Sequence, residues 1–179
     1  LAAALTEMVA GLTIGKKKYA EVEEEMKAAI EPMHAICEHL LDDIKRDSES
    51  FDLYMQALTL PKETEEEKAA RQEAMQNGLK AAVAVPLSVA KRAYEIMPYA
   101  EVMVTKGNKT AVTDALVATM MARTAVLGAL FNVKINLESI KDEAFVAETT
   151  KEVEVLEKKA IEHEQKILAK AGVSKSVVE

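Results

Sequence analysis

The sequence has few of the residues that build disulfides, strands or tight turns. Its 179 residues include one cysteine, no tryptophan, six glycines and four prolines, and aromatic side chains make up only 4%. The single cysteine, Cys37, cannot form a disulfide within the chain and fits a reducing compartment. This compartment indicates the cytoplasm. Strand-forming patterns are almost absent, so we expect an all-α protein.

The sequence also lacks the signatures of several functional classes. It carries 23 basic and 30 acidic side chains, and the net charge of −7 argues against nucleic-acid binding. There is no Walker loop and no GxGxxG, CxxC or HExxH motif. His34 and Glu38 are four residues apart, but two ligands do not make a metal site. We therefore expect no bound metal.

Hydrophobic runs are too interrupted to indicate a membrane protein. Residues 115–133 form the longest late apolar stretch, and Arg123 lies within it. Residues 1–14 are also apolar, but they include Glu7 and no basic side chain. We expect neither a membrane span nor a signal peptide.

The sequence is rich in good helix formers such as Ala, Glu, Lys, Leu and Met. The length suffices for one domain with a real core, so we expect residues 1–179 to form a single-domain bundle of long, partly kinked helices. Pro32 and Pro86 are expected to bend their helices, and Met97-Pro98 to end one. Apolar spacing and capping residues predict helices over 1–14, 20–60, 64–97, 108–137 and 143–171.

The helix over residues 108–137 is expected to lie at the centre of the bundle. Small residues recur along it in alternating steps of four and three, and the same count then reaches Asn132 and Asn136. Asn108 is a candidate N-cap, and Asp114 lies one turn into the helix. Two interpretations remain open: a packed core helix whose amides are buried hydrogen-bonding groups, or a polar pocket within the helical core. The small residues are Ala111, Ala115, Ala118, Ala122, Ala125 and Ala129.

Asp47 is the carboxylate whose position best fits a general acid or base. Four residues after it comes Phe51, which begins an apolar stripe with Tyr54, Met55 and Leu58. A carboxylate on such a stripe is costly to bury, and burial favours its protonated form, as a general acid or base at neutral pH requires. The alternative is a solvated carboxylate at the edge of the stripe.

Lys16, Lys17 and Lys18 form a local basic run on an acidic protein. Cations are favourable near a helix C-terminus, so a solvated helix end explains the run. The functional alternative is an anion-binding rim.

Taken together, several segments resemble the cyclodeaminase/cyclohydrolase family, which occurs as the C-terminal domain of formiminotransferase-cyclodeaminase and as stand-alone bacterial proteins. They follow the family's order across nearly the whole chain. Two departures are visible: the family's Pro-Gly-Gly-Gly-Ser segment is not in this sequence, and Lys45 stands where the family often has a second Asp. The matching segments are MVAGLTIGKKKY (8–19), DSESF (47–51), LPK (60–62), AVPL (84–87), Gly107-Asn108 with Asp114, and FNVKINL (131–137).

The resemblance implies an all-helical folate enzyme, usually a homodimer, that acts on tetrahydrofolate derivatives without a further cofactor. The expected reaction is closure of 5-formiminotetrahydrofolate to 5,10-methenyltetrahydrofolate with loss of ammonia, and Asp47 matches the family's catalytic carboxylate. Hydrolysis of the methenyl compound at the same site is the sister reaction. A formiminotransferase is a possible partner. A rival from another class is a non-catalytic helical dimer or scaffold.

The same resemblance suggests roles for the other polar residues. Asn108, Asp114, Asn132 and Asn136 are candidates for binding the pterin ring, and the alternative is that they are buried structural caps. Lys16, Lys17 and Arg71 are candidates for binding the glutamate tail of a polyglutamylated folate.

Overall fold

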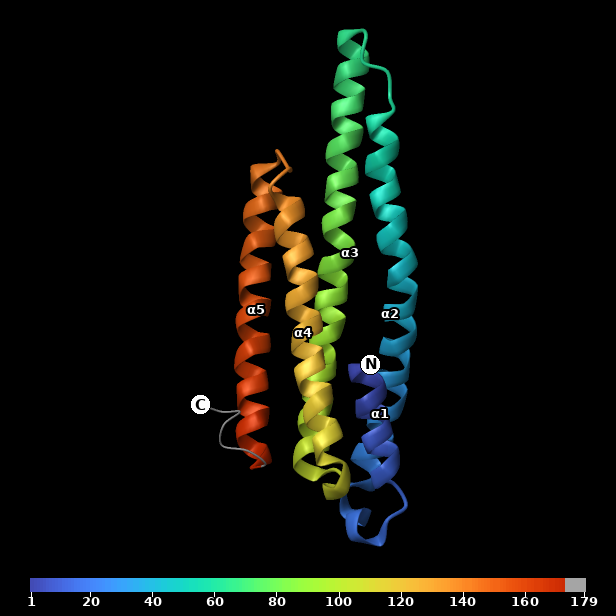
Figure 1. Ribbon diagram of the computed structural model, residues 1–179, viewed down its shortest axis with the longest axis vertical. Helices are drawn as coiled ribbons and strands as arrows, with labels where there is room; N and C mark the ends of the chain where they lie inside the picture. The colour runs from blue at the N-terminus through green and yellow to red at the C-terminus, as the bar shows by residue number, and fades with distance from the viewer. Residues whose placement is uncertain (173–179) are drawn as a thin grey trace.

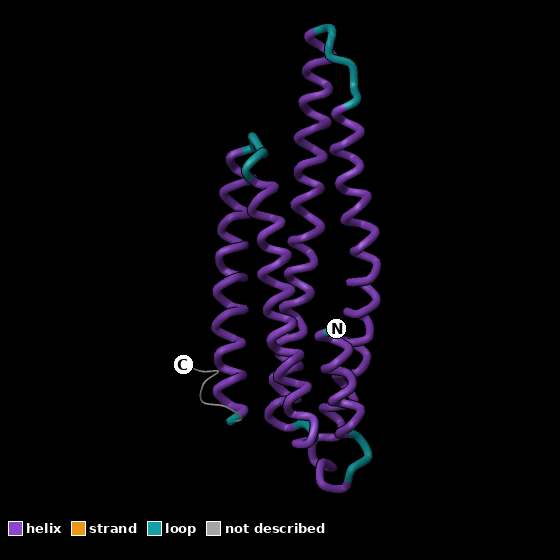
Figure 2. The backbone as a smooth tube through the Cα atoms, in the orientation of Figure 1, coloured by secondary structure: helices purple, strands orange, loops and turns teal. Residues whose placement is uncertain are grey.

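The structure, a computed structural model, describes residues 1–172 and is built from α-helices (Figures 1 and 2). Over those residues there are five α-helices, two short 3-10 helices and no strand, which confirms the expected all-α class. The helices are α1 (Ala2–Thr13), η1 (Lys17–Val22), α2 (Glu23–Leu58), α3 (Glu65–Lys106), η2 (Lys109–Ala111), α4 (Val112–Leu137) and α5 (Glu143–Ala171).

The ends of the helices follow local chemistry that the sequence already indicates. At the start of α3, the Glu67 amide donates to Thr64 Oγ1 and the Thr64 amide donates to the Glu67 carboxylate, each over 3.1 Å, which forms a capping box. Asp142 caps α5 by accepting from the Phe145 amide. Gly172 ends α5 with a φ of 62°, a left-handed conformation that glycine adopts without strain.

The prolines do not break their helices, contrary to the predicted end of the third helix at Met97-Pro98. α3 continues through Pro86 and Pro98 to Lys106, and α2 continues through Pro32. A proline in a helix leaves the carbonyl four residues earlier without its donor. For Pro86 that carbonyl belongs to Ala82, and Asn136 Nδ2 of α4 donates to it over 2.9 Å. Packing against α4 thus replaces the missing bond.

α3 lies at the centre of the bundle and packs against the four other α-helices. Figure 1 shows α5 on one side of the α3–α4 pair and α1 with α2 on the other. The α2–α3 hairpin extends beyond the α4–α5 turn. In this hairpin the two backbones come close at Gly78, where a Cβ atom would lie 2.8 Å from Tyr54 Cα. A larger residue at 78 would push the helices apart.

The alanine seam of the apolar helix α4 is packed inside the bundle. Ala115, Ala118 and Ala122 are fully buried, and α4 contacts α1, α3 and α5. With η2 it forms the one segment of residues 1–172 that is long and apolar enough to cross a membrane by length and composition alone, Lys109–Leu137. Of its most apolar stretch, 44% is buried inside the fold, as a core helix requires.

Candidate active site

A groove opens where the alanine seam of α4 leaves the packed core. Its polar part is a cavity of about 360 Å³ between α2, α3 and α4. Ala125 and Ala129 form the α4 wall, and their small side chains leave the space that larger residues would fill. The complete lining is Leu40, Asp43, Ile44, Asp47, Pro86, Val89, Ala125, Ala129 and Asn132.

Asp47 faces this groove from α2, but it is exposed and not buried as an apolar stripe would require. The inward face of α2 is one residue out of step with the predicted stripe. It contains the buried Ser50 and Ala57, whereas Phe51 is 57% exposed. Within residues 1–172 the Asp47 side chain has no ion-pair or hydrogen-bond partner. A free carboxylate at the wall of a groove can accept a proton from a bound ligand and return it.

Asp43, one turn before Asp47, is a buried carboxylate that the sequence patterns did not single out. Its side chain is 1% exposed, and its two oxygens accept from Arg46 Nη1 on the same helix and Arg92 Nη1 on α3. Asp43 continues the buried face that begins with Met26, Ala29, Met33 and Ile36, at a step of seven from Ile36, and that helical spacing is the signal that could have found it.

The two asparagines at the end of the seam have different surroundings. Asn132 lines the groove opposite Asp47, is exposed, and donates to the Gly128 carbonyl of its own helix over 3.2 Å. Asn136, one turn further, is half-buried and holds the Ala82 carbonyl that Pro86 leaves free. Each interpretation of the seam is therefore correct for one part of it. One end of the seam is packed core, and the other end lines a pocket that contains the Asn132 amide.

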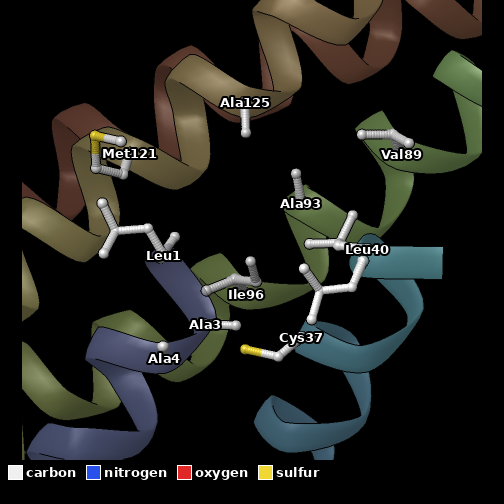
Figure 3. Close-up of a pocket in the computed structure, with 12 residues that line it drawn as sticks. Leu1, Ala3, Ala4, Cys37, Leu40, Val89, Ala93, Ile96, Met121 and Ala125 are labelled. Carbon is white, nitrogen blue, oxygen red and sulfur yellow. The ribbon is translucent and has the colours of Figure 1, made fainter. Parts of the chain in front are cut away.

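The groove continues into an apolar cavity of about 470 Å³ near the start of α1 (Figure 3). The two cavities share Leu40, Val89 and Ala125, so they adjoin one another along α2, α3 and α4. Cys37 and Met121 line the apolar end. A ligand with one polar reacting end and one flat apolar part fits such a lining.

Asn108, Asp114, Lys16 and Lys17 lie at the other end of the bundle from the α2–α3 turn. Asn108 is buried and ties α1 to the start of α4. Its amide donates to Thr13 Oγ1 and its side-chain nitrogen to the Leu12 carbonyl, while its oxygen caps η2 at the Thr110 amide. Asp114 is half-buried in the first turn of α4, and both lysines are exposed.

Arg71 lies near the α2–α3 turn and is half-buried. Its Nη2 donates to the Leu58 carbonyl at the end of α2 over 3.1 Å, and its buried Nε has no partner within the described residues. The structure therefore brings Asp47 and Asn132 together, with Asn136 one turn away, and separates Arg71 from Lys16 and Lys17.

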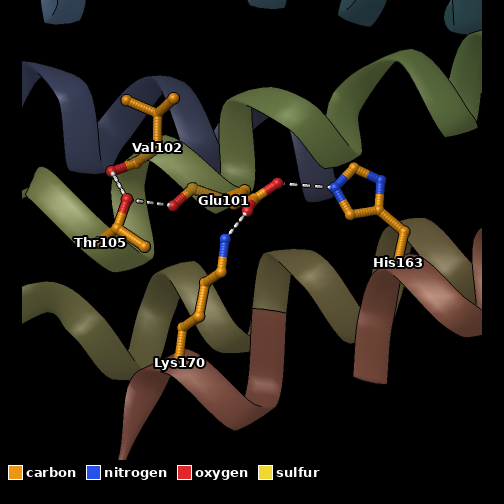
Figure 4. A network of polar contacts seen from close by, with 5 residues as sticks. All are labelled: Glu101, Val102, Thr105, His163 and Lys170. Carbon is orange, nitrogen blue, oxygen red and sulfur yellow. Dashed lines mark hydrogen bonds and ion pairs between the residues drawn. The ribbon is translucent and has the colours of Figure 1, made fainter. Parts of the chain in front are cut away.

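A second polar cluster joins α5 to α3 outside the groove (Figure 4). The Glu101 carboxylate pairs with Lys170 and, over 2.8 Å, with His163 Nε2. Lys170 and then His163 lower the pKa of Glu101 below its ordinary value. On α5, burial raises the pKa of the Glu164 carboxyl, and the nearby Arg123 of α4 opposes that shift. His163 is only 17% exposed, so it is part of the α3–α5 contact.

Comparisons with known proteins identify the family and agree with the all-α fold. The family model described as formiminotransferase-cyclodeaminase matches residues 1–155. A crystal structure of formiminotetrahydrofolate cyclodeaminase from Thermotoga maritima superposes with a TM-score of 0.78 at 32% identity, covering 94% of this chain and 81% of that chain. The chain belongs to the formiminotransferase-cyclodeaminase family.

Two relatives show how the family varies around this chain. A methenyltetrahydrofolate cyclohydrolase from Methylorubrum extorquens is 42% identical over 156 residues, which are 87% of this chain and 75% of that protein. The formimidoyltransferase-cyclodeaminase of Gallus gallus is 37% identical over 169 residues, which are 94% of this chain but 31% of that protein. The chain thus spans less than a third of the latter relative's length.

Proposed function

We propose that this protein is a tetrahydrofolate one-carbon enzyme that closes 5-formiminotetrahydrofolate to 5,10-methenyltetrahydrofolate and releases ammonia. The observation that carries the proposal is the unpaired Asp47 carboxylate in a groove with a polar end at Asn132 and an apolar extension toward Cys37. Membership of a family whose relatives are named for these reactions supports it.

The reaction needs one proton to move between two nitrogens. N10 attacks the carbon of the protonated formimino group (–CH=NH₂⁺) and gives a tetrahedral centre that bears N5, the N10 that still holds its proton, and the former imino nitrogen as NH₂. Asp47 takes the proton from N10 and delivers it to the departing nitrogen, which then leaves as ammonia while the N5–carbon–N10 bridge forms. Such acid–base help contributes roughly 10²–10⁴-fold in rate. Holding N10 against the carbon contributes further through orientation.

A second candidate reaction is hydrolysis of 5,10-methenyltetrahydrofolate to the 10-formyl compound. It is favoured by the 42% identity to a protein named methenyltetrahydrofolate cyclohydrolase. Water attacks the same carbon and Asp47 takes a proton from it. Asp47 then returns that proton to N5 as the bond from carbon to N5 breaks, and the remaining hydroxyl loses its proton to solvent as it becomes the formyl carbonyl. The tetrahedral centre differs only by oxygen in place of nitrogen, so one groove serves both reactions.

The remaining expectations belong to this proposal. The protein acts in the cytoplasm, needs no metal or cofactor beyond its folate, forms a homodimer and works alongside a formiminotransferase. Asn132 is the asparagine available to the pterin ring, since it is exposed in the cavity wall and bonds only within its own helix, whereas Asn108 and Asn136 hold carbonyls of other helices. Asp114 would bind folate only as a second contact far from Asp47. Lys16 and Lys17 lie at one end of the bundle and Arg71 near the other, so a glutamate tail that leaves the groove runs either toward the two lysines or toward Arg71.

An absorbance assay with an Asp47→Asn variant tests the function. Formation of methenyl product from 5-formiminotetrahydrofolate, reduced about 10²-fold or more in the variant, supports the cyclodeaminase and its acid/base. Loss of methenyltetrahydrofolate faster than the blank, with no activity on the formimino substrate, supports the cyclohydrolase. No activity on either substrate, with no folate-induced rise in melting temperature, contradicts both and favours the non-catalytic scaffold.

A further inference from the structure

Asp43 and Asp47 are two carboxylates on one face of α2 with opposite surroundings. They are four residues apart, so their positions on the helix differ by about 6 Å along the axis. Both line the polar cavity. Asp43 is buried and holds two guanidinium groups, whereas Asp47 is exposed and holds none among residues 1–172. We propose that Asp43 is a positioning residue that keeps Arg46 and Arg92 away from Asp47.

Arg92 makes no other ion pair within residues 1–172, whereas Arg46 has Asp42 and Glu49 within one helical turn on α2. Arg46 precedes Asp47 on α2, and Arg92 reaches α2 from α3. An arginine–carboxylate pair is a charge-assisted hydrogen bond, and a long side chain changes rotamer at small cost to make one. If Asp43 lost its charge, the next carboxylate along the same face would be Asp47. Asp43 therefore competes with Asp47 for both guanidinium groups and wins by being closer and buried.

The other side chains around Asp47 are neutral or point to solvent, so they do not pair with Asp47. On α2, Lys45 is 3.5 Å from Glu49 and points to solvent. From α3 the cavity receives the neutral Pro86 and Val89, and from α4 the neutral Asn132. Among the described residues that line the cavity, the charged group besides Asp47 is thus Asp43, whose oxygens hold both arginines.

This inference rests on the proposed function, in which Asp47 must gain and lose a proton. A carboxylate pinned by a guanidinium stays ionised and is no longer free to turn toward the substrate. Removing Asp43 alone is expected to silence Asp47, and removing the arginines as well is expected to restore it. A purely structural role for Asp43 predicts no such recovery, because the triple variant has lost every bond of the cluster.

The test compares wild type, Asp43→Asn and the neutral triple variant Asp43→Asn/Arg46→Met/Arg92→Met, with kcat and KM measured across pH on the accepted folate. We expect kcat of Asp43→Asn to fall about tenfold or more, the acid limb of its profile to move to lower pH, and KM to change less than kcat. We expect the triple variant to regain kcat to within about threefold of wild type. Equal losses in both variants, or an unchanged profile in Asp43→Asn, would overturn the proposal.

A second measurement is independent of catalysis and of how well Asp43→Asn folds. Carbon-13 NMR of aspartate-labelled protein follows the Asp47 carboxyl, which is assigned by its absence in Asp47→Asn. Its titration midpoint is expected at lower pH in Asp43→Asn/Arg46→Met and Asp43→Asn/Arg92→Met, which each keep one unpaired guanidinium, than in the triple variant. Equal midpoints refute the proposal even if the protein turns over no folate, whereas inactivity with shifted midpoints refutes only the proposed function.

Discussion

Lys16 and Lys17 lie far from the groove, and the distance decides what they can bind. Asp47 is 24 residues beyond the start of α2, which corresponds to about 36 Å along the helix axis. The single glutamate of an unextended folate cannot bridge that distance when its reacting atoms are at Asp47. Only a long polyglutamate tail reaches the exposed lysines, and its carboxylates are the anions that a basic run attracts.

A Lys16→Ala/Lys17→Ala variant is therefore expected to raise KM for a long polyglutamylated substrate by about fivefold while leaving the monoglutamate nearly unchanged, since two surface ion pairs contribute about 1 kcal/mol. Steady-state kinetics with both substrates make the comparison, and Lys158→Ala/Lys159→Ala on α5 is the matched control. An equal rise for the two folates would refute the role of these lysines in tail binding.

Single residues also show what the sequence could and could not reveal. Thr64, Asp142 and Gly172 act through neighbours within a few positions, so their capping roles follow from the local sequence. Asp43 acts through Arg92 on another helix, 49 residues away. Its burial depends on how α2 turns against α3, which no local pattern specifies.

At the scale of helices, Pro86 and Asn136 form a pair that joins α3 to α4. The proline frees the Ala82 carbonyl, and the asparagine satisfies it. Asn136→Leu should lower the free energy of unfolding by about 1–3 kcal/mol, because it leaves a carbonyl without a donor. In a Pro86→Ala background the backbone amide at position 86 can bond that carbonyl, so the same substitution should cost less.

Urea unfolding of the four proteins of this double-mutant cycle gives the coupling energy. A coupling of about 1 kcal/mol or more is expected for groups in direct contact. Additive effects of the two substitutions would show that Asn136 does not compensate for the proline. Asn132→Leu, which removes only a bond within α4, is the matched control.

The contact between α3 and α5 should make stability depend on pH at its acid end. Lys170 and His163 lower the pKa of Glu101 in the folded protein, so its ionised form favours folding. This contribution is present above the ordinary value of 4.5 and is lost as pH falls through the lower folded value. Glu164 has the opposite sign, because burial raises its pKa and protonation relieves the cost.

Melting temperatures between pH 3 and 7, about the range in which carboxylates titrate, test this assignment. Glu101→Gln should melt lower than wild type at pH 7, and the difference should shrink toward pH 3. Glu162→Gln, on the exposed face of α5, serves as the control. A difference that stays constant across the range would mean that the Glu101 charge does not contribute.

The helix boundaries show where propensity gives way to packing. The sequence predicts all five helices, but it places a break at Met97-Pro98 that does not occur. A proline inside a helix costs about 3 kcal/mol, and α3 offsets this by contacting every other α-helix of the described chain. The register of α2 around Asp47 was misjudged for the same reason, since the side of a long helix that becomes buried is set by its neighbours.

At the scale of the whole molecule, the projecting end of the α2–α3 hairpin lacks a covering layer. Beyond the α4–α5 turn, α2 and α3 have only each other among the described helices, and the part of α2 that leads to this end carries Phe51, Leu53 and Met55, which are 57%, 54% and 45% exposed. A two-helix layer with apolar side chains in water is marginal, because it buries too little surface to offset its ordering entropy. A second copy of the chain is the covering that the proposed homodimer supplies.

Sedimentation at micromolar concentration should therefore give a dimer for wild type and a monomer for Phe51→Lys/Met55→Lys. Dimer formation would bury two unpaired lysines on each protomer, and the cost of removing these charges from water opposes association. A stable dimer needs about 800 Å² buried per partner, more than these side chains alone provide, so flanking parts of the hairpin must also take part. Val155→Lys, an equally exposed apolar position on α5, should remain dimeric. A wild-type monomer, or a dimer that both variants keep, would place the homodimer contact elsewhere or exclude it, and the exposed hairpin would then need another covering partner.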